Sequence, residues 1–271
     1  MTGQMTPELD NDPFVVALRL GFANQEEEAI RRLRELLGSA TDDEQRGWII
    51  IYEARFLGQL LRVAEARVRL AEVRRLWTST PEHDTRIAVG EAALYEAEGN
   101  QARALTEFTK ILKDYAGQWH TPDLQESYEE VQANRGRLLV VQDRWKEALP
   151  LLEETLRSDK GKSGEFYYNL GYCYFMAEDW EKAESFLNEA LIRELPRKFW
   201  CAAHYYLGRV HYCRSEFEQA VKDFQTAEKY AADSATSPRV IHGELARTYK
   251  ELGMIDQALR YSQMYYSPKP N

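Results

Sequence analysis

Residues 169–191 read NLGYCYFMAEDWEKAESFLNEAL, and this stretch decides the fold of the chain. Gly171 stands twelve residues before Ala183, and the large side chains Tyr174 and Leu187 accompany them. Residues three or four positions apart share one face of a helix. Two small residues therefore let a pair of helices approach closely, while the large side chains fill the space beside the contact. The stretch predicts two helices joined by a short turn.

The same register recurs along the chain. Seven alanines act as anchors, at Ala29, Ala66, Ala104, Ala148, Ala183, Ala220 and Ala258, with separations of 37, 38, 44, 35, 37 and 38 residues. Twelve residues before them stand Ala17, Ala54, Ala92, Gly136, Gly171, Gly208 and Ala246. Nine before stand Leu20, Leu57, Tyr95, Leu139, Tyr174, His211 and Tyr249, and four after stand Leu33, Leu70, Phe108, Leu152, Leu187, Phe224 and Ser262. Between the two helices of a pair lie residues that end helices, such as Asn24, Gly99, Asp143 and Gly253.

This pattern resembles the tetratricopeptide-repeat family. The resemblance is clearest in residues 169–191 and continues in residues 206–227, 244–264 and 93–112. It covers about residues 12–266, although Glu53, Glu91 and Arg135 stand where the family has leucine. The resemblance implies an all-α fold, a right-handed superhelical solenoid of about seven helix-turn-helix repeats. Neighbouring repeats must stack because one pair cannot bury its apolar face alone.

No polar linker interrupts the register, so we expect one domain. Residues 1–11 are predicted to be a flexible N-terminus, residues 12–266 the solenoid and residues 267–271 a C-terminal tail. The 44-residue interval contains an insertion at residues 115–125, which includes Trp119, His120 and Pro122. Two interpretations stay open: a long loop that tucks one tryptophan over the edge of the solenoid, or a side wall of a binding site.

Composition narrows the class of protein. Hydrophobic residues make up 44% and charged residues 29% of the chain, which is typical of a globular protein. No apolar run is long enough to span a membrane, and the N-terminus lacks the pattern of a secretory signal. Cys173, Cys201 and Cys213 cannot all pair and form no CxxC motif, which favours a reducing, cytoplasmic location. The net charge of −9 disfavours nucleic acid and anionic membrane as partners.

The sequence offers two hints of chemistry, and both have a structural explanation. Gly161, Lys162 and Ser163 end like a phosphate-binding loop, but helical text with no strand precedes them, which favours a turn between repeats. Cys201, His204, His211 and Cys213 lack the paired spacing of a zinc site, and the register places both histidines in the core. We therefore predict no catalytic residue, no metal and no cofactor, so the chain is not expected to be an enzyme.

The resemblance implies that the first helices of successive pairs line a concave face. Eleven residues before the anchors, this stripe carries four arginines in a chain of net charge −9. Guanidinium groups bind carboxylates and phosphates through two parallel hydrogen bonds, and tyrosines add rigid contact area. We therefore predict a non-enzymatic protein-interaction scaffold that binds an acidic or phosphorylated peptide segment. The predicted groove residues are Arg55, Asn134, Arg137, Tyr168, Asn169, Tyr172, Tyr205, Arg209, Tyr212, Arg247 and Lys250.

Three alternatives remain at this point. The arginines are either ligand-binding or else solvated and paired with glutamates such as Glu130 and Glu165. The same groove would also suit a nucleic-acid or nucleotide sensor, with arginines on phosphates and tyrosines stacked on bases. Finally, the protein could be a self-associating structural subunit, a homodimer formed through its C-terminal repeat. Leu259, Met264, Tyr265 and Tyr266 give that repeat more apolar surface than one inner face can hide.

Overall fold

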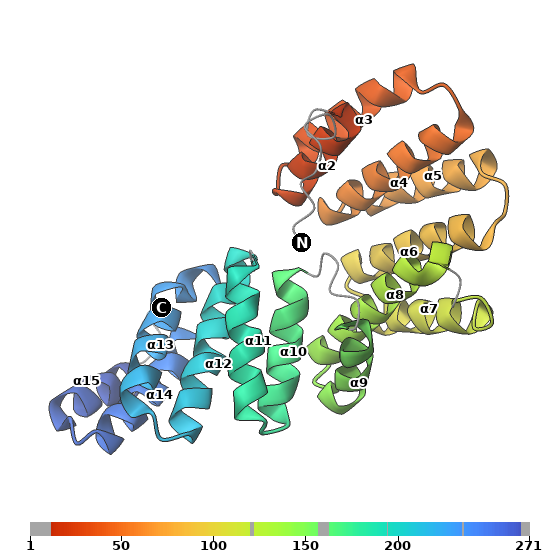
Figure 1. Cartoon of the computed structure of the whole chain (residues 1–271). Coiled ribbons are helices and arrows are strands. Elements are labelled where there is room, and N and C mark those ends of the chain that lie inside the picture. Colours follow the sequence, from red (N-terminus) through yellow and green to blue (C-terminus); the bar gives the residue numbers. More distant parts are fainter. Residues whose placement is uncertain (1–11, 120–121, 157–162, 194, 235, 267–271) are drawn as a thin grey trace. The chain divides into compact units, whose positions relative to one another are not determined.

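A computed structural model describes residues 12–119, 122–156, 163–193, 195–234 and 236–266, and within these ranges the chain is helical, with no strand (Figure 1). The helices are α2 (Pro13–Phe22), α3 (Glu26–Ser39), α4 (Asp43–Gln59), α5 (Val63–Leu76), α6 (Pro81–Ala97), α7 (Gln101–Asp114), α8 (Pro122–Val141), α9 (Trp145–Leu156), α10 (Gly164–Met176), α11 (Trp180–Ile192), α12 (Trp200–Cys213), α13 (Phe217–Lys229), α14 (Pro238–Glu251) and α15 (Ile255–Tyr266). The predicted N-terminal segment 1–11 and tail 267–271 lie outside the described residues.

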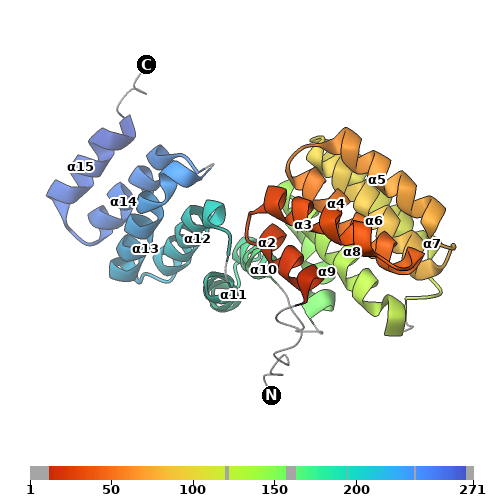
Figure 2. The same cartoon turned by 90° about the horizontal axis from the view of Figure 1, so that it is seen from above.

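The chain divides into two compact units, Met1–Arg135 and Gly136–Asn271, with the boundary inside α8. In the first unit the pairs α4/α5 and α6/α7 lie side by side, and in the second so do α12/α13 and α14/α15 (Figure 2). The expectation of a single domain over residues 12–266 stays a prediction.

The residues at the predicted register positions pack against each other where the two helices of a pair meet. All seven anchor alanines are buried, on α3, α5, α7, α9, α11, α13 and α15. A methyl group added at Gly136, Gly171 or Gly208 would come within 2.6 to 2.7 Å of the nearest side-chain atom of the residue four after the anchor: Leu152, Leu187 and Phe224, respectively. The small residue of the first helix therefore lies directly against the large residue of the second. Among the small residues of the first helices, Ala246 is the exception, because it is only half-buried.

Each pair turns at one residue, five positions before the anchor, whose φ is positive. These residues are Asn24, Leu61, Gly99, Asp143, Glu178, Ser215 and Gly253, with φ between 58° and 75°. The next residue donates its backbone N–H to a carbonyl in the last turn of the first helix, as Asp179 does to Tyr174 at 3.0 Å, and the same bond recurs in all seven pairs. This is the Schellman arrangement, in which a left-handed residue satisfies the final carbonyls of a helix. The sequence predicts four of these seven as turn residues: Asn24, Gly99, Asp143 and Gly253.

The segment between α9 and α10 contains the phosphate-loop-like tripeptide Gly161, Lys162 and Ser163. Ser163, the last residue of the phosphate-loop-like tripeptide, caps α10 by accepting a hydrogen bond from the backbone N–H of Phe166 at 3.3 Å. Gly161 and Lys162 lie outside the described residues. A serine that caps a helix agrees with a turn between repeats.

The insertion in the long interval holds its tryptophan inside the protein. Trp119 is 8% exposed, and its indole N–H donates to the carbonyl of Leu112 at 3.0 Å. Its ring contacts those of Tyr115 and Tyr128, with centroids 5.9 and 5.5 Å away. These contacts favour the tucked loop, while His120 lies outside the described residues.

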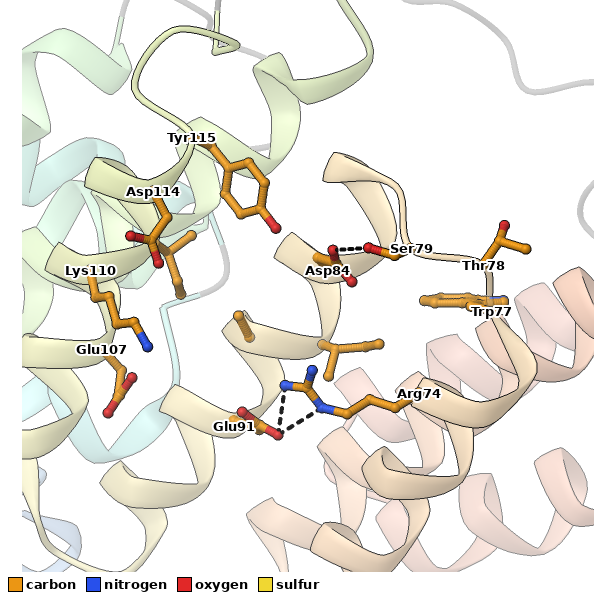
Figure 3. Close-up of a pocket in the computed structure, with 13 residues that line it drawn as sticks. Arg74, Trp77, Thr78, Ser79, Asp84, Glu91, Glu107, Lys110, Asp114 and Tyr115 are labelled. Carbon is orange, nitrogen blue, oxygen red and sulfur yellow. Dashed lines mark hydrogen bonds and ion pairs between the residues drawn. The ribbon is translucent and has the colours of Figure 1, made fainter.

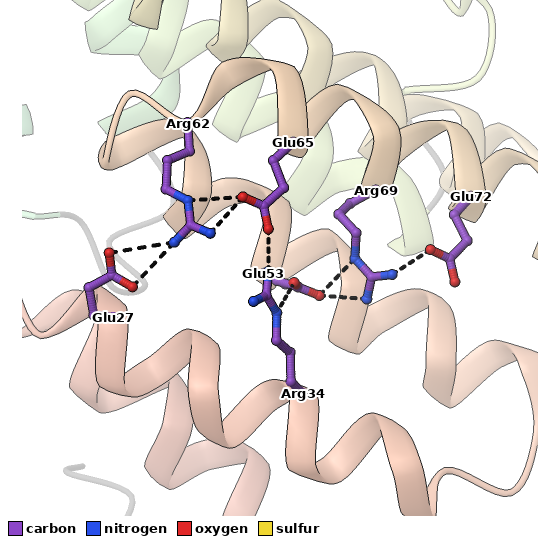
Figure 4. Close-up of polar contacts among 7 residues, drawn as sticks. All are labelled: Glu27, Arg34, Glu53, Arg62, Glu65, Arg69 and Glu72. Atoms are coloured by element: carbon purple, nitrogen blue, oxygen red, sulfur yellow. Dashed lines mark hydrogen bonds and ion pairs between the residues drawn. The ribbon is translucent and has the colours of Figure 1, made fainter.

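Glu53, where the family has leucine, is fully buried on α4 between two arginines of neighbouring helices (Figure 4). Arg34 of α3 donates to it at 2.7 Å, and Arg69 of α5 donates two hydrogen bonds at 2.8 and 2.6 Å. A buried carboxylate is tolerated when hydrogen-bonded opposite charges surround it. An ion cluster, extended at the surface by Glu27, Arg62, Glu65 and Glu72, thus replaces the apolar contact.

Candidate functional site

Three first helices of the second unit, α10, α12 and α14, form one continuous surface, which we call the first-helix face. The rings of Tyr172 on α10 and Tyr206 on α12 lie 5.2 Å apart, and the guanidinium of Arg209 on α12 lies 5.5 Å from the ring of Phe175 on α10. Arg209 also reaches Glu244 on α14 at 3.4 Å. The predicted groove residues that these three helices carry are Tyr168, Asn169, Tyr172, Tyr205, Arg209, Tyr212, Arg247 and Lys250.

Four half-buried tyrosines form the aromatic part of the face. Tyr206 lies at their centre, with its ring centroid 6.4, 5.2 and 5.3 Å from those of Tyr168, Tyr172 and Tyr205. Burial raises the pKa of Tyr206 to about 12. Its hydroxyl therefore stays protonated well above neutral pH and is able to donate a hydrogen bond. The sequence prediction missed Tyr206, although it stands fourteen residues before its anchor, as Asn169 does.

Every predicted arginine faces a carboxylate. In the second unit, Arg137 lies 3.8 Å from Glu165, and Arg209 and Arg247 each lie 3.4 Å from Glu244. In the first unit, Arg55 lies 3.6 Å from Glu130. Glu130 and Glu165 are the two glutamates that the solvated interpretation had named. The stripe is therefore a series of ion pairs and not a row of unpaired positive charge.

Glu244 stands out because two arginines share it. Its side chain is 8% exposed, and its Oε2 has no hydrogen-bond partner although Arg247 is nearby. Arg209 also donates to the hydroxyl of Tyr205 at 3.2 Å, while the guanidinium of Arg247 lies 5.9 Å from the ring of Tyr212. Glu251 and Glu178 also act on Tyr212 and Cys213 beside these arginines, so the two guanidiniums share this part of the face with several carboxylates. Lys250, one turn beyond Arg247, is exposed.

The two predicted groove asparagines do not present free amides. Asn169 is buried. Asn134 belongs to the first unit, and its amide nitrogen donates to the carbonyl of Glu130 within α8 at 2.9 Å. Their role as ligand-binding residues stays a prediction.

The predicted core histidines form a polar cluster between α11, α12 and α13. His211 is buried, its Nδ1 lies 2.8 Å from Asp223 and its Nε2 lies 3.2 Å from Glu184. The hydrogen bond with Asp223 raises the pKa of His211. His204 is only half-buried, and of the nearby thiols Cys201 is buried whereas Cys213 is exposed. No group of three or more metal-ligating side chains occurs among the residues that the structure describes.

A pocket of about 510 Å³ lies in the first unit, between the end of α5, α6 and α7 (Figure 3). Trp77 and Tyr115 line it together with several charged residues. The indole nitrogen of Trp77 lies against Gly47 of α4, and Glu91 accepts a hydrogen bond from Arg74 at 3.0 Å. Arg74 and Ser79 of this pocket donate hydrogen bonds to Glu91 and Asp84, whereas the buried indole nitrogen of Trp77 has no hydrogen-bond partner among the described residues. We assign the pocket no ligand.

The fold defines a class of protein before any comparison: an all-helical repeat protein built from stacked helix pairs. A model of the tetratricopeptide-repeat family matches residues 134–197. No curated protein sequence matches the chain. Residues 134–197 are therefore tetratricopeptide repeats by sequence, and the described chain has the tetratricopeptide-repeat fold.

Solved structures agree with this fold. The chain is similar to pilF of Pseudomonas aeruginosa, with a TM-score of 0.59, 18% identity, and coverage of 83% of this chain and 93% of that one. It is also similar to a Pyrococcus horikoshii signal transduction ATPase with a tetratricopeptide repeat sensor, with a TM-score of 0.63, 16% identity, and coverage of 96% and 42%. The Cut9–Hcn1 assembly of the APC/C gives a TM-score of 0.58 at 12% identity, with coverage of 96% and 47%. Tetratricopeptide repeats are in general scaffolds for protein interaction, and in general non-catalytic. Among the described residues, no helix has the length and apolar character needed to cross a membrane.

Proposed function

We propose that this chain is a non-enzymatic, cytoplasmic protein-interaction scaffold whose first-helix face binds an acidic or phosphorylated peptide segment. The pairing of Arg209 and Arg247 with the single carboxylate of Glu244 is the observation that carries the proposal. A guanidinium has five N–H donors, so contacts of 3.4 Å with one carboxylate leave Arg209 and Arg247 with N–H groups that can donate to an anionic ligand.

The surrounding side chains suit a peptide. Tyrosine gives a large contact area at low conformational cost and is enriched in interaction surfaces. Tyr168, Tyr172, Tyr205 and Tyr206 supply such rings on two adjacent helices, and Tyr172 is held in place by a hydrogen bond from its hydroxyl to Asp143 at 2.7 Å. A fixed aromatic surface beside two arginines fits an extended segment that carries acidic side chains.

The test uses fluorescein-labelled Gly-Ser peptides in which every second residue is either glutamate or lysine, with binding followed by fluorescence anisotropy. The glutamate peptide is expected to bind and the lysine peptide not to bind. The double variant Arg209→Glu/Arg247→Glu should abolish binding. Arg144→Glu is the matched control, because Arg144 is an exposed arginine of the same unit in the turn before α9.

Far-UV circular dichroism melts should be nearly the same for all of these proteins. Equal binding of both peptides, or of the double variant and the wild type, would contradict the proposal. Labelled oligothymidine tests the nucleic-acid alternative. Binding of this probe that weakens steeply with salt and requires the same arginines would replace the peptide by a nucleic acid.

Self-association through the last helix pair is the second candidate, favoured by the exposed apolar surface of α15. Leu259 is 57% and Tyr266 74% exposed, although the equivalent of Leu259 in the preceding repeat, Val221, is buried. Val221 is covered by the next helix pair, α14 and α15. Light scattering at micromolar concentration tests this candidate. A monomer for both the wild type and the Tyr265→Ser/Tyr266→Ser variant would exclude it.

A further inference from the structure

His211 on α12 has a carboxylate oxygen in front of each of its ring nitrogens. Its Nδ1 lies 2.8 Å from Oδ2 of Asp223 on α13, and its Nε2 lies 3.2 Å from Oε1 of Glu184 on α11. An ionised carboxylate only accepts hydrogen bonds, and a neutral imidazole carries one N–H group and one lone pair. Only the doubly protonated ring donates to both carboxylates. The geometry therefore requires the imidazolium form of His211.

The other charged groups around this ring also favour its proton. Glu216, just before α13, has an oxygen 3.8 Å from Nε2 of His211. Arg214, just after α12, binds both Glu184 and Glu216, so one arginine faces more than one carboxylate. The hydrogen bond with Asp223 raises the pKa of His211, although burial acts in the opposite direction. The cation is thus the form that the surrounding charges stabilise.

Loss of one proton affects the two contacts of the ring unequally. Asp223 is 8% exposed, and its other oxygen lies 3.7 Å from His204, so without Nδ1–H it would lose its closest hydrogen-bond donor. A buried carboxylate without a donor is strongly unfavourable, so the remaining proton stays on Nδ1. Nε2 then presents a lone pair to Glu184, which is half-buried and keeps its contact with Arg214. The contact that is lost joins two helix pairs, because Glu184 belongs to α10/α11 whereas His211 belongs to α12/α13.

We propose that His211 is a proton-operated link between the neighbouring helix pairs α10/α11 and α12/α13, closed when its ring is a cation and open when the ring is neutral. The same two pairs carry the aromatic part of the first-helix face, where the ring of Tyr206 lies 5.2 Å from that of Tyr172 and 5.1 Å from that of Phe175. The link therefore makes the cohesion of that face depend on pH. It does not depend on which partner the face binds, so it is tested separately from the proposed function.

The first experiment measures the protonation of His211 by NMR of the full chain labelled with nitrogen-15 in its histidines, with His211→Gln used to assign the signals. Both ring nitrogens of His211 should carry a proton at about pH 6.5, where half of a free imidazole is neutral. Glu184→Gln removes the charge across the two pairs and should lower the proton affinity of His211 about tenfold. Glu189→Gln is the matched control, because Glu189 is on the same helix, its side chain is 35% exposed against 32% for Glu184, and it binds Arg193. This control should leave the proton affinity of His211 unchanged.

The second experiment measures the opening of the link by amide hydrogen exchange, below and above the titration midpoint of His211, with rates corrected for the intrinsic effect of pH. The pKa of His211 is raised above its unfolded value of about 6.5, so the link is closed below that pH and opens as pH rises through the folded pKa. Protection of α11 and α12 should therefore fall about tenfold at the higher pH, since a hydrogen bond between charged groups is lost. Protection of the last pair, α14/α15, should not change. In His211→Gln the two pH values should give the same protection throughout.

Either experiment can overturn the link. A neutral His211 at about pH 6.5, or equal effects of Glu184→Gln and Glu189→Gln on its proton affinity, would refute it. Equal protection of α11 and α12 on both sides of the midpoint would do the same, as would an equal loss in α14/α15, because the whole unit would then respond to pH. Should His211→Gln not fold, the signals of His211 are assigned by replacing the other histidines in turn. Glu184→Gln then serves for the exchange measurement, and its protection of α11 and α12 must be the same on both sides of the midpoint.

Discussion

Replacing Gly171 by alanine should destabilise the second unit, although alanine is the better helix former. The new methyl group would lie 2.7 Å from Cγ of Leu187 and 3.0 Å from its backbone nitrogen. Leu187 is fully buried, so neither atom can move away without disturbing α10 or α11. Overpacking of this kind costs about 1–3 kcal/mol, against a gain in helix propensity of about 1 kcal/mol. We therefore expect a net loss of up to about 2 kcal/mol.

The matched control is Gly38→Ala, because a methyl group at this exposed helical position of α3 would meet nothing within 4 Å. This variant should gain about 1 kcal/mol from helix propensity alone. Urea unfolding of the full chain, followed by circular dichroism, compares the two variants with the wild type. In Gly171→Ala/Leu187→Ala the two changes should be coupled, with a combined cost below the sum of the single costs. If Gly171→Ala proves as stabilising as Gly38→Ala, the close helix contact that defines the repeat is refuted.

Three further perturbations test other parts of the structure. Leu61→Gly should stabilise the chain by about 1 kcal/mol, because Leu61 is 70% exposed and its φ is 59°; an unchanged Tm would contradict this. Glu53→Gln should cost about 3 kcal/mol in urea unfolding because it breaks a buried ion cluster, whereas Glu65→Gln on the exposed side of the cluster should cost less than about 1 kcal/mol. The pKa of His211 is raised by its hydrogen bond with Asp223, so its stabilisation is complete below the unfolded pKa of about 6.5 and is lost as pH rises through the folded pKa. Burial alone would raise the pKa of Asp223, but its histidine partners lower it, so the stabilisation that ionised Asp223 contributes is lost at acidic pH. In thermal melts, His211→Gln should remove the fall in Tm on the alkaline side.

The fold could be predicted from the sequence because its main determinants are local. A small residue, an anchor alanine and large residues at fixed spacing place the same side chains on the same helix faces in every repeat. Asn24, Gly99, Asp143 and Gly253 could be recognised as turn residues because glycine, asparagine and aspartate tolerate a positive φ. Leu61, Glu178 and Ser215 occupy the equivalent position in their pairs and could not be recognised by type. There the packing of the two helices imposes a conformation that the residue itself disfavours.

The charges of the site show where sequence reasoning ends. The register placed Arg209 and Arg247 at equivalent positions of two first helices, but the pairing of both with Glu244 depends on how α12 lies against α14. Glu53 makes the same point: in the sequence it only interrupts a pattern of leucines, and its two arginines come from helices before and after it in the chain. Helix periodicity follows from the backbone geometry of a single segment, so the sequence alone determined the repeats. The distance between charges on different helices follows from packing, so only the tertiary structure decided which carboxylate each arginine faces.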